Sequence, residues 1–375
     1  MTDNTNNKNT SVTRNDAVID TAGLVREGEE LPKEPLLKWL NSNINLADGE
    51  PLSGKMKVTQ YSGGASNWTY CLGFDNCELI LRRPPAGTKA KGAHDMGREY
   101  KLQDSLKPVF NKVPTMLGYT NDESVIGAEF YVMEKIDGII PRKHFPRGVN
   151  LSPAQATKLC EVALDELINL HNVNIESANL SHIGKGAGYA ERQISGWNKR
   201  YTNAKTWNIP SGKKVMNWLE KHLPSKETIC MTHNDYRFDN LVLDAKDPTN
   251  ILGVLDWELA TLGDPLMDLG NTLAYWVQSD DDFVARSTQR QPTDLPGMMT
   301  RQEVIEYYCH KQGLEPKEFA FYEVYGMFRL AGIVQQIYYR YHHKQTRNKA
   351  YKNLWLFVHY LLYRCNKVIK RYEKQ

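Results

Sequence analysis

The chain has little net charge and no long apolar run. Its 47 Lys and Arg residues nearly balance its 44 Asp and Glu residues, which leaves a formal net charge of +3 over 375 residues. Nucleic-acid-binding proteins carry a basic excess that is missing here, and no apolar stretch reaches the roughly 18 residues of a membrane span. We therefore expect a protein that binds neither nucleic acid nor a membrane. The sequence makes no prediction of the oligomeric state.

Cysteine is also sparse. No two of the six cysteines form a C-x-x-C pair. The six are Cys71, Cys77, Cys160, Cys230, Cys309 and Cys365. This spacing predicts neither a zinc site nor a disulfide framework. The N-terminal residues are rich in Asn and Thr and lack the apolar core of a signal peptide. We predict a cytoplasmic protein whose residues 1–30 form a disordered tail.

The apolar residues, in contrast, are numerous enough for a large core. They make up 41% of the chain, and 375 residues are more than one small domain needs. The hydrophobic period changes from two to about 3.6 along the sequence. We therefore predict an α+β protein with a β-rich N-lobe over residues 31–136, which binds nucleotide, and a helical C-lobe over 137–375, which carries the catalytic and acceptor-binding residues.

The expected elements follow from that change of period. A helix is expected over residues 35–43 and another over 94–106, with strands over 57–61, 68–74, 78–81 and 129–133. Ser152, Pro153 and Gln155 form a strong helix start, because Ser caps well and Gln can complete a capping box. Further helices are expected over 189–204, 212–222, 266–276, 301–311, 318–341 and 351–372, and short strands over 228–232, 241–244 and 251–255.

The segment from His233 to Asn240 has the pattern H-x-D-x-x-x-x-N. Phosphoryl transfer needs a carboxylate that takes the proton of the acceptor hydroxyl, and oxygen ligands for magnesium. Asp235 suits the first task, and the amide oxygen of Asn240 suits the second. Asp256 follows an expected strand and could reach the same metal. The alternative is a polar loop with a hydrogen-bonded His and a capping Asp.

Neighbouring residues extend this interpretation. Arg237 could point back at the transferred phosphate and offset its charge, whereas His233 is expected to brace the loop. Asp264 is expected to cap the helix that begins at Pro265. Asp268 is expected to hold the catalytic loop by hydrogen bonds.

Features of the nucleotide site are expected earlier in the chain. Gly63, Gly64 and Ser66 lie in a turn between two strands, where glycines let the backbone approach phosphate; the alternative is a plain β-hairpin turn. Arg82, at the end of a strand, could hold the α- and β-phosphates, oriented by Glu99; the alternative is a solvated surface pair. The hinge around residues 133–136 exposes backbone groups that could pair with adenine.

Several stretches of this sequence resemble a known family. The block "THNDYRFDNLVLDAKDPTNILGVLDWELATLGDPLMDLG" is similar to the catalytic and metal-binding segment of the aminoglycoside phosphotransferase family. The stretches "YSGGASNWTY", "LRRPPAG", "AHDMGREY" and "YAERQISGW" resemble the kinase modules fused to certain acyl-CoA dehydrogenases and their stand-alone bacterial relatives. The resemblance covers about residues 57–341 and implies a protein-kinase-like fold.

Position by position, the resemblance implies roles for eleven residues. Asp235 matches the catalytic aspartate, Arg237 stands where many kinases carry a Lys facing the γ-phosphate, and Asn240 and Asp256 match the magnesium ligands. The positions implied to bind ATP are Gly63, Gly64 and Ser66 of the phosphate loop, Arg82, Glu99, and the hinge residues Glu134 and Ile136. Arg82 departs from the wider kinase pattern, which has Lys there; Arg binds phosphate bidentately and is not equivalent to Lys.

The resemblance also implies a reaction. We expect an ATP- and Mg²⁺-dependent phosphotransferase that acts on a small hydroxylated acceptor, and the subgroup suggests a hydroxyacyl-CoA thioester. An aminoglycoside is the alternative acceptor. A catalytically silent kinase-like binding module and a metal-dependent phosphohydrolase are alternatives from other classes. The fold and catalytic residues do not decide among acceptors.

Overall fold

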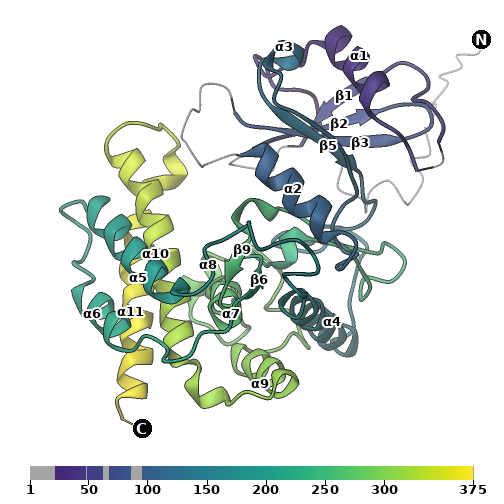
Figure 1. Ribbon diagram of the computed structural model, residues 1–375. Helices are drawn as coiled ribbons and strands as arrows, with labels where there is room; N and C mark the ends of the chain where they lie inside the picture. The colour runs from purple at the N-terminus through teal and green to yellow at the C-terminus, as the bar shows by residue number, and fades with distance from the viewer. Residues whose placement is uncertain (1–21, 48, 62–66, 86–94, 375) are drawn as a thin grey trace, which may run out of the picture.

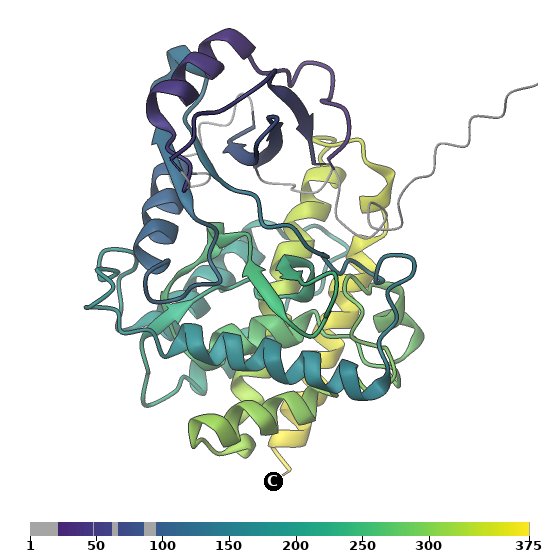
Figure 2. The same cartoon turned by 90° about the vertical axis from the view of Figure 1, so that its right-hand side faces the viewer.

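The computed structural model describes residues 22–374, apart from residues 48, 62–66 and 86–94 and the side chains of residues 317 and 318. The described chain forms two lobes. In Figures 1 and 2 the strands β1 to β5 and the helices α1 to α3 lie above a larger helical lobe. The predicted α+β, two-lobed architecture is therefore confirmed.

The N-lobe is built on one antiparallel sheet with the strand order β1-β2-β3-β5-β4. Its strands are β1 (Lys57–Gln60), β2 (Trp68–Gly73), β3 (Glu78–Arg83), β4 (Met116–Thr120) and β5 (Phe130–Glu134). Side chains alternate between the two faces. Leu79 and Leu81 of β3 join one core with Leu36 and Leu40 of α1 (Lys33–Asn43), whereas Ile80 faces the other side, where α2 (Met96–Leu106) packs through Met96.

Part of the predicted N-terminal tail is packed against this sheet. Gly23 forms a β-bridge with Gln60, and the Tyr70 hydroxyl donates to the Glu29 carbonyl at 2.8 Å. The backbone amide of Arg26 donates to the Gln60 side chain. Residues 23–29 are thus held against the sheet by one backbone bridge and by side-chain hydrogen bonds. Residues 1–21 lie outside the described residues.

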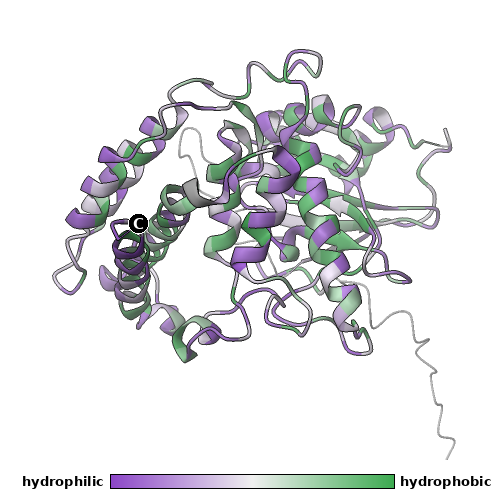
Figure 3. Ribbon diagram, turned by 90° about the horizontal axis from the view of Figure 1, so that it is seen from below, coloured by the Kyte–Doolittle hydropathy of each residue, from purple (hydrophilic) through white to green (hydrophobic). Residues whose placement is uncertain are grey.

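The C-lobe consists mainly of helices around one large core. Among its described residues it contains α4 (Pro153–His171), α5 (Tyr189–Asn203), α6 (Lys213–Lys221), α7 (Pro265–Ala274), α8 (Phe283–Ser287), α9 (Arg301–Gln312), α10 (Ala320–His342) and α11 (Leu354–Tyr372). Seen from below in Figure 3, these helices carry both hydrophobic and hydrophilic residues. Among the described residues, no helix combines the length and the apolar character needed to cross a membrane.

Two small antiparallel strand pairs lie at the boundary with the N-lobe. The strands β6 (Cys230–Thr232) and β9 (Thr261–Gly263) form one pair, and β7 (Leu241–Leu243) and β8 (Ile251–Val254) form the other. The short 3-10 helices η1 (Phe238–Asn240) and η2 (Trp257–Leu259) lie next to them in the chain. These four strands deliver the predicted catalytic segment to the side of the C-lobe that faces the N-lobe.

Most expected elements are present with small shifts at their ends. The predicted start of α4 is confirmed, since Ser152 and Gln155 form both bonds of a capping box. The elements that sequence reasoning missed are short: β4, α3 (Glu123–Ile126), β9 and α8. β4 has an irregular register at Gly118, and β9 has only three residues, so their periodicity is too brief to read.

Helices α7 and α10 cross with their backbones in contact. A Cβ atom added at Gly326 of α10 would lie 2.0 Å from the Gly270 carbonyl oxygen of α7, and one added at Gly270 would lie 2.4 Å from the Tyr322 carbonyl oxygen. Both positions therefore require glycine for steric reasons. Helix α7 contains Asp268 and is capped by Asp264. The crossing therefore holds in place the helix against which the predicted catalytic segment lies.

We predict that Gly326→Ala lowers the free energy of unfolding by roughly 1–3 kcal/mol, because the added methyl group collides with backbone that cannot rotate away. Urea unfolding at neutral pH measures the effect. Gly196→Ala is the matched control, since its Cβ would meet only the flexible end of Arg200 at 3.4 Å. It should stabilise α5 by roughly 0.5–1 kcal/mol. Equal effects of the two variants would contradict the assigned crossing.

Candidate active site

The loop that begins at His233 is held from below by one buried carboxylate. Asp268, in the first turn of α7, accepts the backbone N–H of His233 at 2.7 Å and that of Asn234 at 2.8 Å. It also accepts Nε2 of His171 at 3.1 Å. Burial by itself raises the pKa of Asp268, but the hydrogen bonds from the His171 side chain and from the His233 backbone N–H outweigh it and lower that pKa. The predicted structural role of Asp268 is confirmed.

The ring of His233 braces the same loop. Its Nδ1 accepts the backbone N–H of Asp235 at 3.2 Å, and its Nε2 lies 3.0 Å from the Leu255 carbonyl oxygen. Because Nδ1 accepts and Nε2 donates, this arrangement requires a neutral imidazole with the proton on Nε2. His233 thereby ties the loop to the end of β8, which agrees with the bracing role predicted for it.

Asn234 has a left-handed backbone, with φ at 63°. Its Oδ1 accepts bonds from Tyr189 and Asn271, and its Nδ2 donates to Thr232. Its backbone carbonyl accepts Nη2 of Arg329, a buried residue of α10, at 3.0 Å. Sequence reasoning assigned no role to Asn234. The sequence offered one indication, since Asn tolerates a positive φ better than most residues do. The turn at Asn234 sets the direction in which Asp235 leaves the loop.

Asp235, Arg237 and Asn240 form one hydrogen-bonded group. Nδ2 of Asn240 donates to the backbone carbonyl of Asp235 at 2.9 Å and to its Oδ2 at 3.1 Å. Nη2 of Arg237 lies 3.3 Å from the same Oδ2, and the guanidinium lies 4.6 Å from the ring centre of Tyr275. Burial alone lowers the pKa of Arg237, but Asp235 and Asp239 raise it, so its charge is retained. The amide nitrogen of Asn240 is therefore committed to Asp235, which leaves its oxygen as a ligand atom.

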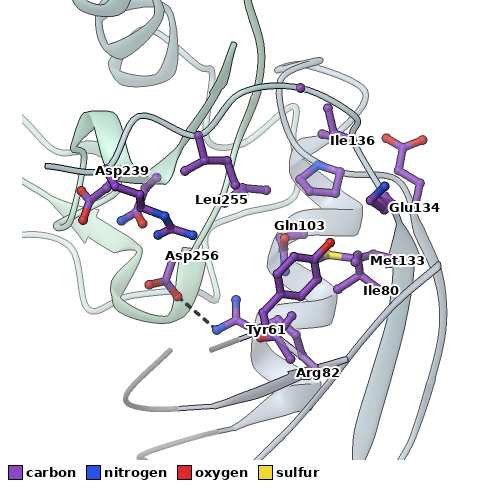
Figure 4. Close-up of a pocket in the computed structure, with 17 residues that line it drawn as sticks. Tyr61, Ile80, Arg82, Gln103, Met133, Glu134, Ile136, Asp239, Leu255 and Asp256 are labelled. Atoms are coloured by element: carbon purple, nitrogen blue, oxygen red, sulfur yellow. Dashed lines mark hydrogen bonds and ion pairs between the residues drawn. The ribbon is translucent and has the colours of Figure 1, made fainter. Parts of the chain in front are cut away.

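Asp256 follows β8 with a left-handed backbone, φ 67°, and points across to the N-lobe. Its Oδ1 lies 3.1 Å from Nη2 of Arg82, the bond drawn dashed in Figure 4. Arg82 also lies 3.7 Å from Glu99 and 3.8 Å from Glu258. Burial alone lowers the pKa of Arg82, but Tyr131 and these three carboxylates raise it. This buried guanidinium thus joins strand β3, helix α2 and the C-lobe.

Glu99 is held in place by two further residues. The Tyr131 hydroxyl donates to its Oε2 at 3.0 Å, and Nδ2 of Asn67 donates to its Oε1 at 3.0 Å. Asn67 also donates to Glu258 at 3.1 Å. Desolvation raises the pKa of Glu99 even though Arg82 lowers it. Sequence reasoning anticipated Arg82 and Glu99 but missed Asn67, Tyr131 and Glu258, because only the fold brings β2, β5 and η2 together.

A cleft between the lobes opens next to these groups. Figure 4 shows Tyr61, Ile80 and Met133 on the N-lobe side and Leu255 on the C-lobe side. Among the other lining residues are Arg82, Glu134, Ile136, Asn240 and Asp256. The cleft thus combines an apolar inner part with a charged end.

The hinge residues Glu134 and Ile136 line the same cleft. The Glu134 backbone N–H donates to the Thr115 carbonyl at 2.9 Å, and its carboxylate accepts the Thr115 N–H at 2.8 Å. Within the described part of the chain, the Ile136 N–H has no hydrogen-bond partner. The predicted phosphate-loop residues Gly63, Gly64 and Ser66 lie outside the described residues.

The donors present fit magnesium better than a transition metal. Among the described residues, no group of three or more His, Cys, Asp or Glu residues could hold a metal ion by itself. Asn240 and Asp256 offer hard oxygen atoms at one end of the cleft. Magnesium takes one or two carboxylates from a protein and completes its shell with water and phosphates. The donor set therefore suits a cation that arrives with a phosphate ligand.

The fold and sequence match known proteins. Residues 57–301 match the model of the phosphotransferase enzyme family. Acyl-CoA dehydrogenase family member 11 of Rattus norvegicus is 36% identical over 76% of this chain and 37% of its own length. Family member 10 of Mus musculus is 33% identical over 84% of this chain and 29% of its own length. The chain thus spans about a third of the length of these relatives, and the predicted resemblance to them is confirmed.

Solved structures extend the comparison. A Ralstonia eutropha structure assigned to the aminoglycoside phosphotransferases superimposes with a TM-score of 0.75 at 28% identity, covering 91% of this chain and 99% of that one. Choline kinase from Cryptosporidium parvum superimposes with a TM-score of 0.62 at 13% identity, covering 91% of this chain and 96% of that one. The predicted kinase-like fold is therefore confirmed.

We predict that Asp268→Asn lowers the free energy of unfolding by roughly 3 kcal/mol at pH 7, because it leaves buried donors without an anion. The pKa of Asp268 is lowered in the folded state, so its contribution is fully present above the unfolded value of about 4 and is lost as the pH falls through the folded pKa. Urea unfolding at several pH values should show the difference from wild type shrinking with acidification. The exposed Asp104→Asn is the control, and a difference that grows below pH 4 would contradict this account.

Proposed function

Because this chain belongs to the phosphotransferase enzyme family, we propose that it transfers the γ-phosphoryl group of ATP to a hydroxyl group of a small molecule. The observation that carries this proposal is the hydrogen-bonded group of Asp235, Arg237 and Asn240 next to Asp256 at one end of the cleft. Phosphoryl transfer asks a protein mainly for positioning and charge stabilisation. The nucleotide would lie between an N-lobe over residues 31–136 and a C-lobe over 137–375.

Asp235 is the proposed catalytic base. Its carboxylate accepts the proton of the acceptor hydroxyl while the acceptor oxygen bonds to the γ-phosphorus and the bond to the bridging oxygen of ADP breaks. Asn240 keeps the carboxylate oriented through the bond to Oδ2. Arg237 is held beside it by Asp235 and Tyr275, where its charge would stabilise the transferred phosphoryl group.

ATP and magnesium would occupy the cleft. Asn240 and Asp256 would hold Mg²⁺, which when bound neutralises charge on the phosphates. Arg82 would bind the α- and β-phosphates through its planar fork, oriented by Glu99. The adenine ring of ATP would lie between Ile80 and Leu255 and would pair with backbone groups at Glu134 and Ile136. Gly63, Gly64 and Ser66 are proposed to cover the phosphates.

The proposed acceptor is a hydroxyacyl-CoA thioester. Support comes from the relatives, whose names identify them as acyl-CoA dehydrogenase family members. An aminoglycoside is the second candidate, because a 28% identical structure is assigned to the aminoglycoside phosphotransferases. A screen with γ-labelled ATP across hydroxyacyl-CoAs, aminoglycosides, choline and sugars tests both. Transfer to none of these acceptors would favour a kinase-like binding module without turnover.

We predict that Asp235→Asn reduces kcat by roughly 10²–10⁴-fold, the range for loss of a general base. ATP binding should change little, because the side chain faces the acceptor oxygen and not the nucleobase. Steady-state kinetics and calorimetric titration with ATP measure the two effects separately. Asp104→Asn on the outer face of α2 should behave like wild type, and a fully active Asp235→Asn protein would show that another group takes the proton.

We predict that Asp256→Ala weakens binding of Mg·ATP by at least tenfold, roughly 1.4 kcal/mol. The rise in melting temperature that Mg·ATP gives the wild-type protein should then shrink strongly. Thermal shift assays with and without Mg²⁺ make the comparison. The variant also frees Arg82, so its unliganded melting temperature must be measured alongside. An undiminished Mg·ATP effect would rule Asp256 out as a metal ligand.

A further inference from the structure

A second cationic cluster lies beside the catalytic loop, on helices α5 and α10. These two helices lie side by side in Figure 1 and pack against each other. The guanidinium of Arg200 lies 4.6 Å from the ring centre of Trp197, and that of Arg329 lies 5.6 Å from the same ring. We call Trp197, Arg200 and Arg329 the Trp197 cluster. Two guanidinium groups thus lie against one indole ring.

The cluster has more hydrogen-bond donors than the described protein uses. Arg329 is only 5% exposed, and within the described residues its one hydrogen bond goes to the Asn234 carbonyl. A guanidinium has five N–H donors. The buried indole N–H of Trp197 has no partner among the described residues either. Arg200 is exposed and, in the described part of the chain, has no carboxylate within ion-pair distance.

Charge is retained at this position. Burial alone lowers the pKa of Arg329, but Tyr325, Tyr275 and Asp235 raise it. A buried cation is costly unless an anion or several hydrogen bonds compensate it. Among the described residues, the Asn234 carbonyl is the one hydrogen-bond acceptor of Arg329, and Asp235 acts on the guanidinium without a direct ion pair. The free donors therefore match a ligand with a negative charge.

The Trp197 ring packs closely against helix α10. Gly332 of α10 faces it so closely that a Cβ atom there would lie 3.0 Å from Cε3 of Trp197. Arg329 is in turn anchored to the carbonyl of Asn234, the residue directly before Asp235. The cluster is thus positioned by backbone contacts at a defined place next to the proposed base.

We propose that the Trp197 cluster binds an anionic group of the phosphate acceptor, a phosphate or a carboxylate. This inference rests on the proposed function, since it names the class of acceptor that the same site takes. Planar guanidinium groups recognise both phosphate and carboxylate. A polycationic acceptor would be repelled by the same arginines, so the cluster favours an acyl-CoA thioester over an aminoglycoside.

The test compares one acyl chain with different charges attached. Phosphoryl transfer is measured with 4-hydroxypentanoyl-CoA, with the uncharged 4-hydroxypentanoyl-pantetheine and with free 4-hydroxypentanoate. Arg200→Ala should raise the KM of the charged acceptor by about tenfold, the size expected for one charge-assisted hydrogen bond, with kcat and the KM of the pantetheine thioester unchanged. A selective effect on the CoA thioester identifies phosphate as the group, and one on the free acid identifies carboxylate.

Lys199→Ala is the matched control. It removes the same charge from the neighbouring, exposed position of α5, and it should leave every KM unchanged. If Arg200→Ala and Lys199→Ala behave alike, or if Arg200→Ala affects the pantetheine thioester equally, the anion site is refuted while the transferase assignment stands. If no acceptor is phosphorylated, the proposed function fails, and calorimetric titration of wild type and Arg200→Ala with CoA and with 4-hydroxypentanoate still decides whether the cluster binds anions.

Discussion

The candidate active site depends on the hydrogen bonds that the buried carboxylate of Asp268 accepts. Two consecutive backbone N–H groups, those of His233 and Asn234, converge on it, and His171 completes its shell. A carboxylate without these bonds could not remain charged at this depth. The same bonds hold Asn234 in its left-handed conformation. The direction of Asp235 is therefore determined by α7, a helix that contributes no atom to the cleft.

Arg82 plays the corresponding role between the lobes. Its guanidinium is shared by Glu99 and by Asp256 and Glu258, which come from opposite sides of the cleft. A second arginine supports the same junction: Arg98 of α2 donates to the carbonyl oxygens of Ala260 and Ile183 in the C-lobe. Helix α2 is consequently fixed from two directions. An arginine at position 82 suits this geometry, because its planar fork can satisfy several carboxylates at once, whereas a lysine is a single point charge.

Three arginines of the C-lobe lie against aromatic rings. Arg237 stacks on Tyr275, and Arg200 and Arg329 stack on Trp197. Stacking on aromatic rings holds a guanidinium in place without neutralising it. Arg237 and Arg82 also form ion pairs with carboxylates of the protein. Arg200 and Arg329 differ from them, because no carboxylate of the described residues lies within ion-pair distance of either guanidinium.

By itself, the sequence determined the local structure and the order of the chemical groups. The capping box of Ser152, the N-cap of Asp264 and the H-x-D-x-x-x-x-N spacing depend on residues a few positions apart, so they could be read directly. The tertiary structure alone decided which distant residues meet. Asn67 reaches Glu258 across 191 positions, and Arg329 reaches Asn234 across 95. Such contacts follow from how helices and strands pack, and no short-range pattern encodes them. The short strands β4 and β9 escaped for the same reason, since their partners and not their own periodicity make them strands.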